Sequence, residues 1–139
     1  QQRFAITGSV NQFGEVQVIG GVNEKIEGFY ELCKARGLDG SHGVVVPAAS
    51  VRHMMLREDV VQAAAEGLFH IYAVKTVDEA MTVLTGVPAG EPDAKGVIPK
   101  GTLNHKVASV LAEMTAARRA QADIEGLAGS REHRRGHGA

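Results

Sequence analysis

The sequence has 139 residues, of which 44% are hydrophobic and 22% are charged, and its formal net charge is -1. This composition is typical of one globular domain with an apolar core. The near-neutral charge argues against nucleic acid or an anionic membrane as the main partner. With 4% aromatic residues and no Trp, a stacking surface for single-stranded bases is also excluded. No apolar run approaches the roughly 20 residues that cross a bilayer.

The single cysteine, Cys33, excludes an internal disulfide framework and fits a reducing compartment, so we expect a cytoplasmic location. The first residue is Gln1, and the start does not resemble a signal peptide. We therefore expect the numbering to begin within a larger protein.

The first quarter of the chain predicts two strands and a helix. Residues 4–7 alternate in size as a half-buried strand does, residues 11–14 have turn chemistry, and residues 15–18 alternate polar with apolar. A hairpin is the simplest way to join these two strands. Asn23 is a plausible N-cap for a helix over 24–36, with Gly37 as a left-handed C-terminal stop. One face of this helix carries apolar side chains at helical spacing, from Ile26, Phe29, Tyr30 and Cys33.

The next fifty residues alternate between strands and helices. Residues 43–47 form a continuous apolar run, typical of a strand covered on both faces. Ser50 is a candidate cap for a short helix through residues 54–55, and residues 59–65 predict another helix, closed by Gly67. Residues 69–74 predict a strand. Thr76 and Glu79 form a capping box that opens a helix running to Gly86. The order indicates a mixed α/β (α+β) layered fold, a hairpin followed by alternating helices and strands.

After Gly86 the composition changes. Residues 87–101 contain three of the four prolines and predict a linker. Residues 102–127 predict an amphipathic helix with an apolar face of Leu103, Val107, Val110, Leu111 and Met114. The small, basic, His-rich residues 128–139 predict a disordered tail.

Lys25 is the most informative side chain. It lies in the first turn of the predicted helix, where the positive end of the dipole disfavours a cation. It also shares a ridge with Phe29 and Leu32, so its stem is expected to run along the shoulder of the buried face. Both effects disfavour the ammonium form, as a lysine that accepts a proton requires. A snorkelling surface lysine is the alternative reading of the same geometry.

Other candidate sites have weaker signals. Gly20-Gly21 before a helix is a possible phosphate cradle, but without further Gly spacing a tight turn is the better interpretation. His133 and His137 have metal-ligand spacing in a tail that offers no third ligand, while His42, His53, His70 and His105 are scattered, so no metal site is predicted. Cys33, on the apolar helix face, is interpreted as a core residue and not as a nucleophile.

The motif Thr7-Gly8-Ser9 followed by Ile19-Gly20-Gly21-Val22-Asn23-Glu24-Lys25 closely resembles the Lon protease family. Downstream, Ala35-Arg36-Gly37, Val46-Pro47 and residues 76–80 continue the match, which covers about residues 4–86. The Gly-Ser-Val-Asn-Gln variant and residues 90–94 resemble the Lon-B-like branch. Residues 1–86 are thereby interpreted as the C-terminal portion of a Lon proteolytic domain with a ribosomal-protein-like two-layer fold.

The resemblance implies the chemistry of an ATP-dependent serine endopeptidase that degrades unfolded or damaged proteins. In the family the lysine matching Lys25 is the general base of a Ser–Lys dyad, and the threonine matching Thr7 helps to orient it. The family's nucleophile lies in a motif that is expected upstream of Gln1. Ser9, Ser41, Ser50, Ser109 and Ser130 lack its flanking pattern, so the 139 residues alone are expected to be inactive.

The resemblance further implies a homo-hexamer and an AAA+ ATPase module that uses ATP and Mg²⁺. The 139 residues contain no Gly-x-x-x-x-Gly-Lys-Ser/Thr loop, so no cofactor is expected within them. A non-catalytic Lon-like α/β module for interaction or oligomerisation is the rival hypothesis. A serine motif in the parent protein, just upstream of Gln1, would separate the two.

Overall fold

A computed structural model describes residues 3–135, with side chains described as far as residue 122 and at Ile124. The chain divides into two compact units, residues 1–89 and 90–139. The boundary falls inside the predicted linker. Each unit is described by itself below.

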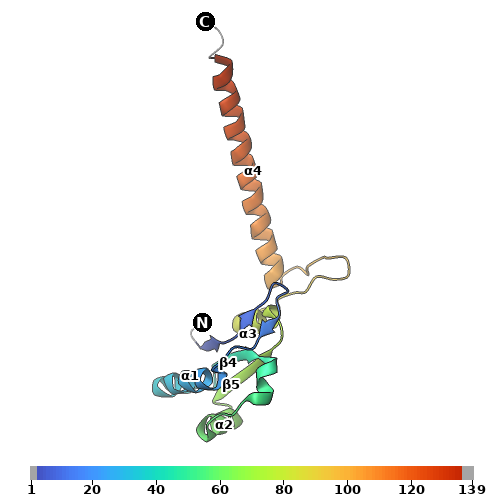
Figure 1. The fold of residues 1–139 in the computed structure, drawn as a ribbon. Helices are drawn as coiled ribbons and strands as arrows, with labels where there is room; N and C mark the ends of the chain where they lie inside the picture. The colour runs from blue at the N-terminus through green and yellow to red at the C-terminus, as the bar shows by residue number, and fades with distance from the viewer. Residues whose placement is uncertain (1–2, 136–139) are drawn as a thin grey trace. The chain divides into compact units, whose positions relative to one another are not determined.

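The first unit is built on a three-stranded parallel sheet in the order β1-β4-β5 (Figure 1). Its strands are β1 (Phe4–Ile6), β4 (His42–Pro47) and β5 (Phe69–Val74). Phe4 is in register with Gly43, and His42 with Phe69. The crossover from β1 to β4 contains α1 (Val22–Arg36), and that from β4 to β5 contains α2 (Glu58–Ala65). Parallel strands can be joined only through long crossovers, and α1 and α2 lie in these crossovers.

The predicted hairpin forms, but from different strands. β2 (Ser9–Val10) pairs antiparallel with β3 (Val16–Gln17), while β1 joins β4 in the parallel sheet. The prediction that residues 4–7 are one arm of the hairpin is therefore wrong. Gly8, at φ 148°, separates β1 from β2. The turn over residues 11–14 is as predicted: Asn11 Oδ1 accepts the N–H groups of Phe13 and Glu15 at 2.9 and 3.0 Å.

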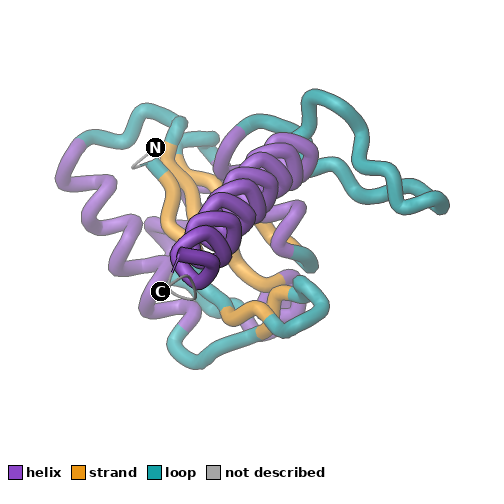
Figure 2. The backbone as a smooth tube through the Cα atoms, turned by 90° about the horizontal axis from the view of Figure 1, so that it is seen from above, coloured by secondary structure: helices purple, strands orange, loops and turns teal. Residues whose placement is uncertain are grey.

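Helices cover both faces of the parallel sheet. On one face, α1 and α2 pack against β4 and β5 through a core of Ile26, Tyr30, Cys33, Val44, Val46, Val60, Ala63 and Phe69. On the other face, Val45 and Val74 pack against Ala80 of α3 (Val77–Thr85). Figure 2 shows the strands with helical segments beside them. The mixed α/β class is confirmed, and the run of valines in β4 is buried on both faces as its sequence predicts. The resemblance implies two layers, a sheet with helices on one face. In this structure α3 adds a third layer on the other face of the sheet.

Two predicted helix caps are confirmed in part. Thr76 Oγ1 accepts the N–H of Glu79 at 3.2 Å, as the capping box requires, but the Glu79 carboxylate accepts the N–H of Lys75 at 2.6 Å instead of that of Thr76. Gly37 follows α1 with φ 92° and ψ 113°, a positive φ whose ψ is not that of the left-handed helix.

Two other predicted caps are wrong. Asn23 lies inside α1, which begins one residue earlier, and the N-cap is Gly21 with φ 72°. Ser50 lies inside a 3₁₀ helix, η1 (Ala48–His53), instead of opening a helix to residue 55. In both places the backbone of a preceding residue, Gly21 or Pro47, starts the helix without a side-chain cap.

The second unit contains α4 (Leu103–Arg135), which begins where the sequence predicts but runs past residue 127. The helix thus extends into the predicted tail as far as Arg135, and residues 136–139 lie outside the described part of the chain, so disorder of the tail stays a prediction. A glycine such as Gly129 costs a helix interior about 1 kcal/mol, and the surrounding Ala, Arg and Glu residues favour helix enough to continue it.

Candidate functional site

The start of α1 holds the predicted catalytic lysine. Gly21 adopts the left-handed conformation that turns the chain into the helix, and the first intrahelical bond runs from Lys25 N–H to Gly21 O at 3.1 Å. The Lys25 side chain is exposed and folds back, so that Nζ donates to Gly20 O at 3.3 Å. None of the ion pairs among the described residues involves Lys25. Its amine therefore lies at the positive end of a helix without a carboxylate partner.

The surroundings of Lys25 differ from those predicted. Ile26, Tyr30 and Cys33 form the buried ridge of α1, with exposed fractions of 0%, 4% and 3%. Leu32, predicted to lie beside the lysine stem, is 46% exposed. Lys25 thus projects from the solvent side of the helix start, and the described residues do not desolvate it.

Thr7, the second predicted site residue, lies at the end of β1. Its N–H donates to Val45 O at 3.0 Å, which extends the β1–β4 pairing by one residue. Its side chain is 7% exposed, and Oγ1 has no hydrogen-bond partner among the described residues. No hydrogen bond therefore joins Thr7 to Lys25, and its orienting role stays a prediction.

A pocket of about 270 Å³ opens beside the first turn of α1. Its lining comes from the segment before α1, from the first turn of the helix and from η1, through Val18, Ile19, Gly21, Val22, Asn23, Glu24, Ser50 and His53. Ser50 is 5% exposed, and its Oγ has no partner among the described residues. A buried hydroxyl without a partner is uncommon and calls for an explanation.

The sequence does not predict Ser50 and His53 as pocket residues, because the pattern around Ser50 favours a helix cap. A signal was present: both follow the carboxyl end of the buried strand β4. In open α/β sheets ligands bind beyond the carboxyl ends of the strands.

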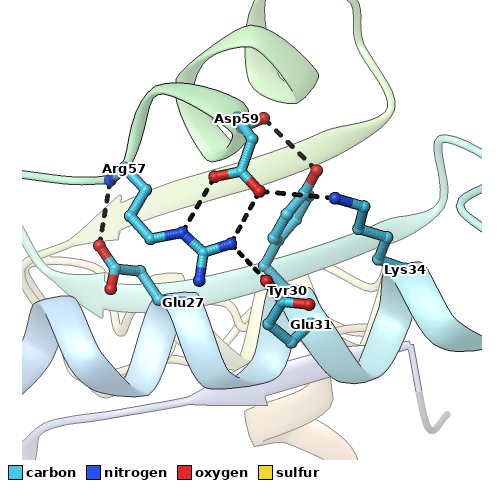
Figure 3. Close-up of polar contacts among 6 residues, drawn as sticks. All are labelled: Glu27, Tyr30, Glu31, Lys34, Arg57 and Asp59. Carbon is cyan, nitrogen blue, oxygen red and sulfur yellow. Dashed lines mark hydrogen bonds and ion pairs between the residues drawn. The ribbon is translucent and has the colours of Figure 1, made fainter.

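Two sets of contacts hold η1 and the segment after it against α1. Asn23 Oδ1 accepts the N–H of Met55 at 3.2 Å, immediately beside the pocket. Farther along α1, Arg57 bridges the two segments (Figure 3). Its backbone N–H donates to Glu27 at 3.0 Å, and its guanidinium contacts Glu31 and pairs with Asp59 at 2.7 and 3.1 Å.

Asp59 connects this ion-pair cluster to the next turns of α1. Lys34 Nζ lies 3.6 Å from its carboxylate, and Tyr30 Oη donates to its backbone carbonyl at 3.4 Å. Hydrogen bonds to the carboxylates of Asp59 and Glu31 raise the pKa of Arg57, and the hydrogen bond from the Arg57 guanidinium holds the pKa of Asp59 below its usual range. The cluster holds the start of α2 against α1. It thereby also holds the segment between η1 and α2, which directly follows the pocket residue His53.

A second pocket, of about 550 Å³, is lined by Glu15, Val16, Ala48, Ala49, Arg52, Val74, Lys75 and Thr76. No group of three or more His, Cys, Asp or Glu side chains in the described part of the chain could hold a metal ion. His137 lies outside the described residues, as do the side chains of His133 and Ser130. No helix within residues 3–135 is long and apolar enough to cross a membrane.

The first unit is therefore an α/β unit with parallel strands. It carries a lysine at the start of a helix and a pocket beside the first turn of that helix. Over 83 residues the chain is 52% identical to a protein of Escherichia coli (strain K12) named "Putative Lon protease homolog". Over 85 residues it is 46% identical to a protein of the same name from Haemophilus influenzae (strain ATCC 51907 / DSM 11121 / KW20 / Rd). The matches cover 60% and 61% of this chain and 14% of each relative. No family model matches the sequence.

Over about 60% of its length the chain is thus similar to two proteins named as Lon protease homologs, which confirms the resemblance first noted in residues 7–25. It spans about 14% of the length of the curated relatives that it matches.

Proposed function

We propose that this chain is part of the proteolytic domain of a Lon-type serine endopeptidase and supplies its general base, Lys25. One observation supports this most directly. The Lys25 amine lies at the positive end of α1 and has no carboxylate partner among the described residues, and residues of the same helix turn, Gly21 to Glu24, line a pocket. A carboxylate partner would hold the proton on the amine, whereas a helix N-terminus disfavours the charged form.

The proposed mechanism is acyl transfer in two steps. A serine hydroxyl from outside these 139 residues attacks the scissile carbonyl while neutral Lys25 takes its proton. Protonated Lys25 gives this proton to the leaving amine, which departs and leaves Lys25 neutral again. Lys25 then accepts a proton from the water molecule that attacks the acyl-enzyme, and the proton passes to the serine oxygen as the new carboxylate is released. Packing by the serine-bearing segment would supply the desolvation of Lys25 that residues 3–135 do not provide. Thr7 is proposed to orient the amine once that segment is in place.

For the whole protein we propose ATP-dependent degradation of unfolded chains by a cytoplasmic homo-hexamer with an AAA+ module. The sequence contains no Gly-x-x-x-x-Gly-Lys-Ser/Thr loop, so ATP and Mg²⁺ are proposed to bind in the AAA+ module. No step of the peptidase mechanism is therefore assigned to ATP.

The test is a pair of lysine variants in the full-length parent protein. Lys25→Ala should lower peptide hydrolysis by at least about a hundredfold, the lower range for loss of a general base, and leave ATP hydrolysis intact. Lys106→Ala, at an exposed lysine of α4, is the control and should retain peptidase activity. Peptidase activity that survives in Lys25→Ala would remove the lysine from its role.

The rival, a non-catalytic Lon-like module for interaction or oligomerisation, predicts a different outcome. Under that hypothesis the unmodified full-length protein has no peptidase activity that a serine-directed acylating reagent can block. Labelling by such a reagent that requires Lys25 would favour the enzyme.

A further inference from the structure

The second unit exposes apolar side chains along one face of a helix. α4 is a single helix over Leu103–Arg135 (Figure 1), and every residue from 106 to 122 is exposed. Val110, Met114 and Ile124 have exposed fractions of 46%, 62% and 64%. A row of large apolar side chains on one helix face marks an interaction surface. Because helices in proteins gain most of their stability from packing, we expect this face of α4 to pack against a partner.

The spacing along this face is that of a coiled coil. Its apolar members are separated alternately by four and three residues, apart from one polar position, and are Leu103, Val107, Val110, Met114, Ala117 and Ile124. Gln121 fills the remaining position in the repeat. This is the heptad pattern, in which positions a and d form a seam and pack into the spaces between side chains of a second helix. Val107, Met114 and Gln121 occupy position a, where a single polar residue fixes the register of the two helices.

Two charged residues beside the seam identify the second helix as another copy of α4. Glu113 and Arg118 occupy positions g and e, on opposite flanks of the seam, and both are exposed. Helical residues pair when they are three or four apart, whereas these two are five apart, and neither forms an ion pair among the described residues. In a parallel, in-register pair of identical helices, each g residue faces the e residue of the next heptad on the other helix. Glu113 of each copy then faces Arg118 of the other.

The same charges disfavour an antiparallel pair. Antiparallel helices bring position g against g and position e against e. The antiparallel register with the longest overlap of the seam therefore places Glu113 against Glu113 and Arg118 against Arg118. Like charges repel, whereas the parallel register gives two pairs of opposite charges. The charge pattern thus favours the parallel orientation.

We propose that α4 pairs with α4 of a second copy of this chain as a parallel, two-stranded coiled coil over residues 103–124. The a and d side chains pack in the seam, which is about 33 Å long at 1.5 Å per residue. Glu113 of each copy forms an ion pair with Arg118 of the other. The inference goes beyond the proposed peptidase function, because α4 follows residues 4–86, which carry the resemblance, and contains none of the proposed catalytic residues.

The experiment is sedimentation equilibrium of the 139-residue chain between about 5 and 500 µM, in about 0.1 M salt. The weight-average mass should rise from that of one chain toward that of two, with a Kd below about 100 µM. The mass of a single chain at every concentration would overturn the proposal. Association that continues to three or more chains would also contradict it.

A matched pair of variants tests the seam. Met114→Glu places two like charges in the seam and should weaken dimerisation at least about tenfold. Ala112→Glu adds the same charge on the opposite face of the helix and should change the Kd by less than about twofold. Both substitutions introduce a residue that favours helix, so a difference between them does not come from helix propensity. Equal dimerisation of the two variants would contradict the seam.

A charge exchange tests the orientation. Glu113→Arg alone should weaken dimerisation at least about threefold, because each introduced arginine faces Arg118 of the other copy. Adding Arg118→Glu restores opposite charges and should recover the affinity of the unmodified chain. An antiparallel pair predicts no weakening by Glu113→Arg, because it already brings like charges together. No weakening by Glu113→Arg, or no recovery in the double variant, would overturn the proposed arrangement.

These measurements are independent of the proposed function. Dimerisation is measured without hydrolysis, whereas the peptidase role is tested by Lys25→Ala in the full-length protein. Lys25-dependent hydrolysis by a protein whose 139-residue chain stays monomeric would reject the coiled coil alone. Dimerisation through α4 without any hydrolysis would reject the peptidase alone.

Discussion

Cys33 illustrates how position decides the chemistry of a residue. It lies on the buried ridge of α1, with 3% of its surface exposed. Burial raises the pKa of its thiol, and the charge of the nearby Arg36 offsets part of that rise. The thiolate, which is the nucleophile, is therefore disfavoured in the folded chain. This agrees with the interpretation of Cys33 as a packing residue.

We expect the thiol of Cys33 to react with a disulfide reagent such as DTNB far more slowly in the native chain than in urea at the same pH. Slow reaction follows from both the raised pKa and the lack of access. The measurement is the pseudo-first-order rate near pH 8 with and without denaturant. Equal rates in the two states would show that the core around α1 opens freely.

Asp59 makes the stability of the chain depend on pH. Because the hydrogen bonds and charge of Arg57 lower its folded pKa, the unfolded state takes up a proton first as the pH falls. The stabilising contribution is complete above the unfolded pKa, about 3.9, and is lost as the pH falls through the lower folded value. Asp59→Asn should therefore lower the Tm at about pH 7 and have less effect at about pH 3.

Thermal unfolding monitored by circular dichroism at the two pH values checks this expectation. Glu91→Gln, an exposed acid in the second unit, is the control and should leave the Tm of the first unit unchanged at both. If Asp59→Asn were as destabilising at about pH 3 as at about pH 7, the ion-pair cluster would not be the source of the effect.

At the scale of the element, β4 depends on a glycine for its close approach to β5. A Cβ added at Gly43 would lie 2.7 Å from Tyr72 Cε2 and 3.0 Å from the His70 carbonyl oxygen. The backbone oxygen cannot move without disturbing the strand. We expect Gly43→Ala to lower the free energy of unfolding by about 1–3 kcal/mol, the usual effect of overpacking.

Gly20→Ala is the matched substitution, because a Cβ there meets no atom within 4 Å and Gly20 has no positive φ. Its effect on the unfolding free energy should be within about 0.5 kcal/mol. Urea denaturation of both variants measures the difference. A near-neutral Gly43→Ala would show that β4 and β5 separate more easily than their register indicates.

The elements that the sequence predicts best are those with strong local signals. The valines of β4 and the Thr76 cap of α3 both depend on neighbours along the chain. The pairing of β1 with β4 was missed because it joins Phe4 to Gly43, about forty residues away, and no local pattern encodes that choice. The extension of α4 past residue 127 was missed because glycines were given more weight than their helix-forming neighbours.

The residues of the candidate site also differ in whether a local sequence pattern predicts them. Lys25 could be singled out because it sits in a motif at a predicted helix start. Ser50 could not, because its burial and its lack of a partner arise only when η1 folds against α1. Asn23 was singled out for a wrong reason: its side chain accepts from Met55 across the site instead of capping its own helix.

At the scale of the whole molecule, the described core belongs to one unit. Both clusters of buried apolar residues, on the two faces of the parallel sheet, lie entirely within residues 1–89. A helix such as α4 gains little stability from its sequence alone, because most helical stability in proteins comes from packing. The apolar side chains of its first turns, at Val107, Val110, Leu111 and Met114, are each at least 46% exposed.

A chain ending at Ala89 should therefore fold on its own. Because it retains the sheet, both core clusters and the pocket beside α1, we expect cooperative unfolding with a Tm within about 3 °C of that of the 139-residue chain. A chain ending at Gly67 is the control; it loses β5 and α3, including Phe69 and Val74 of the core, and should not unfold cooperatively. If the chain ending at Ala89 also failed to fold, residues 90–139 would have to supply contacts on which the first unit depends, and its autonomy would be disproved.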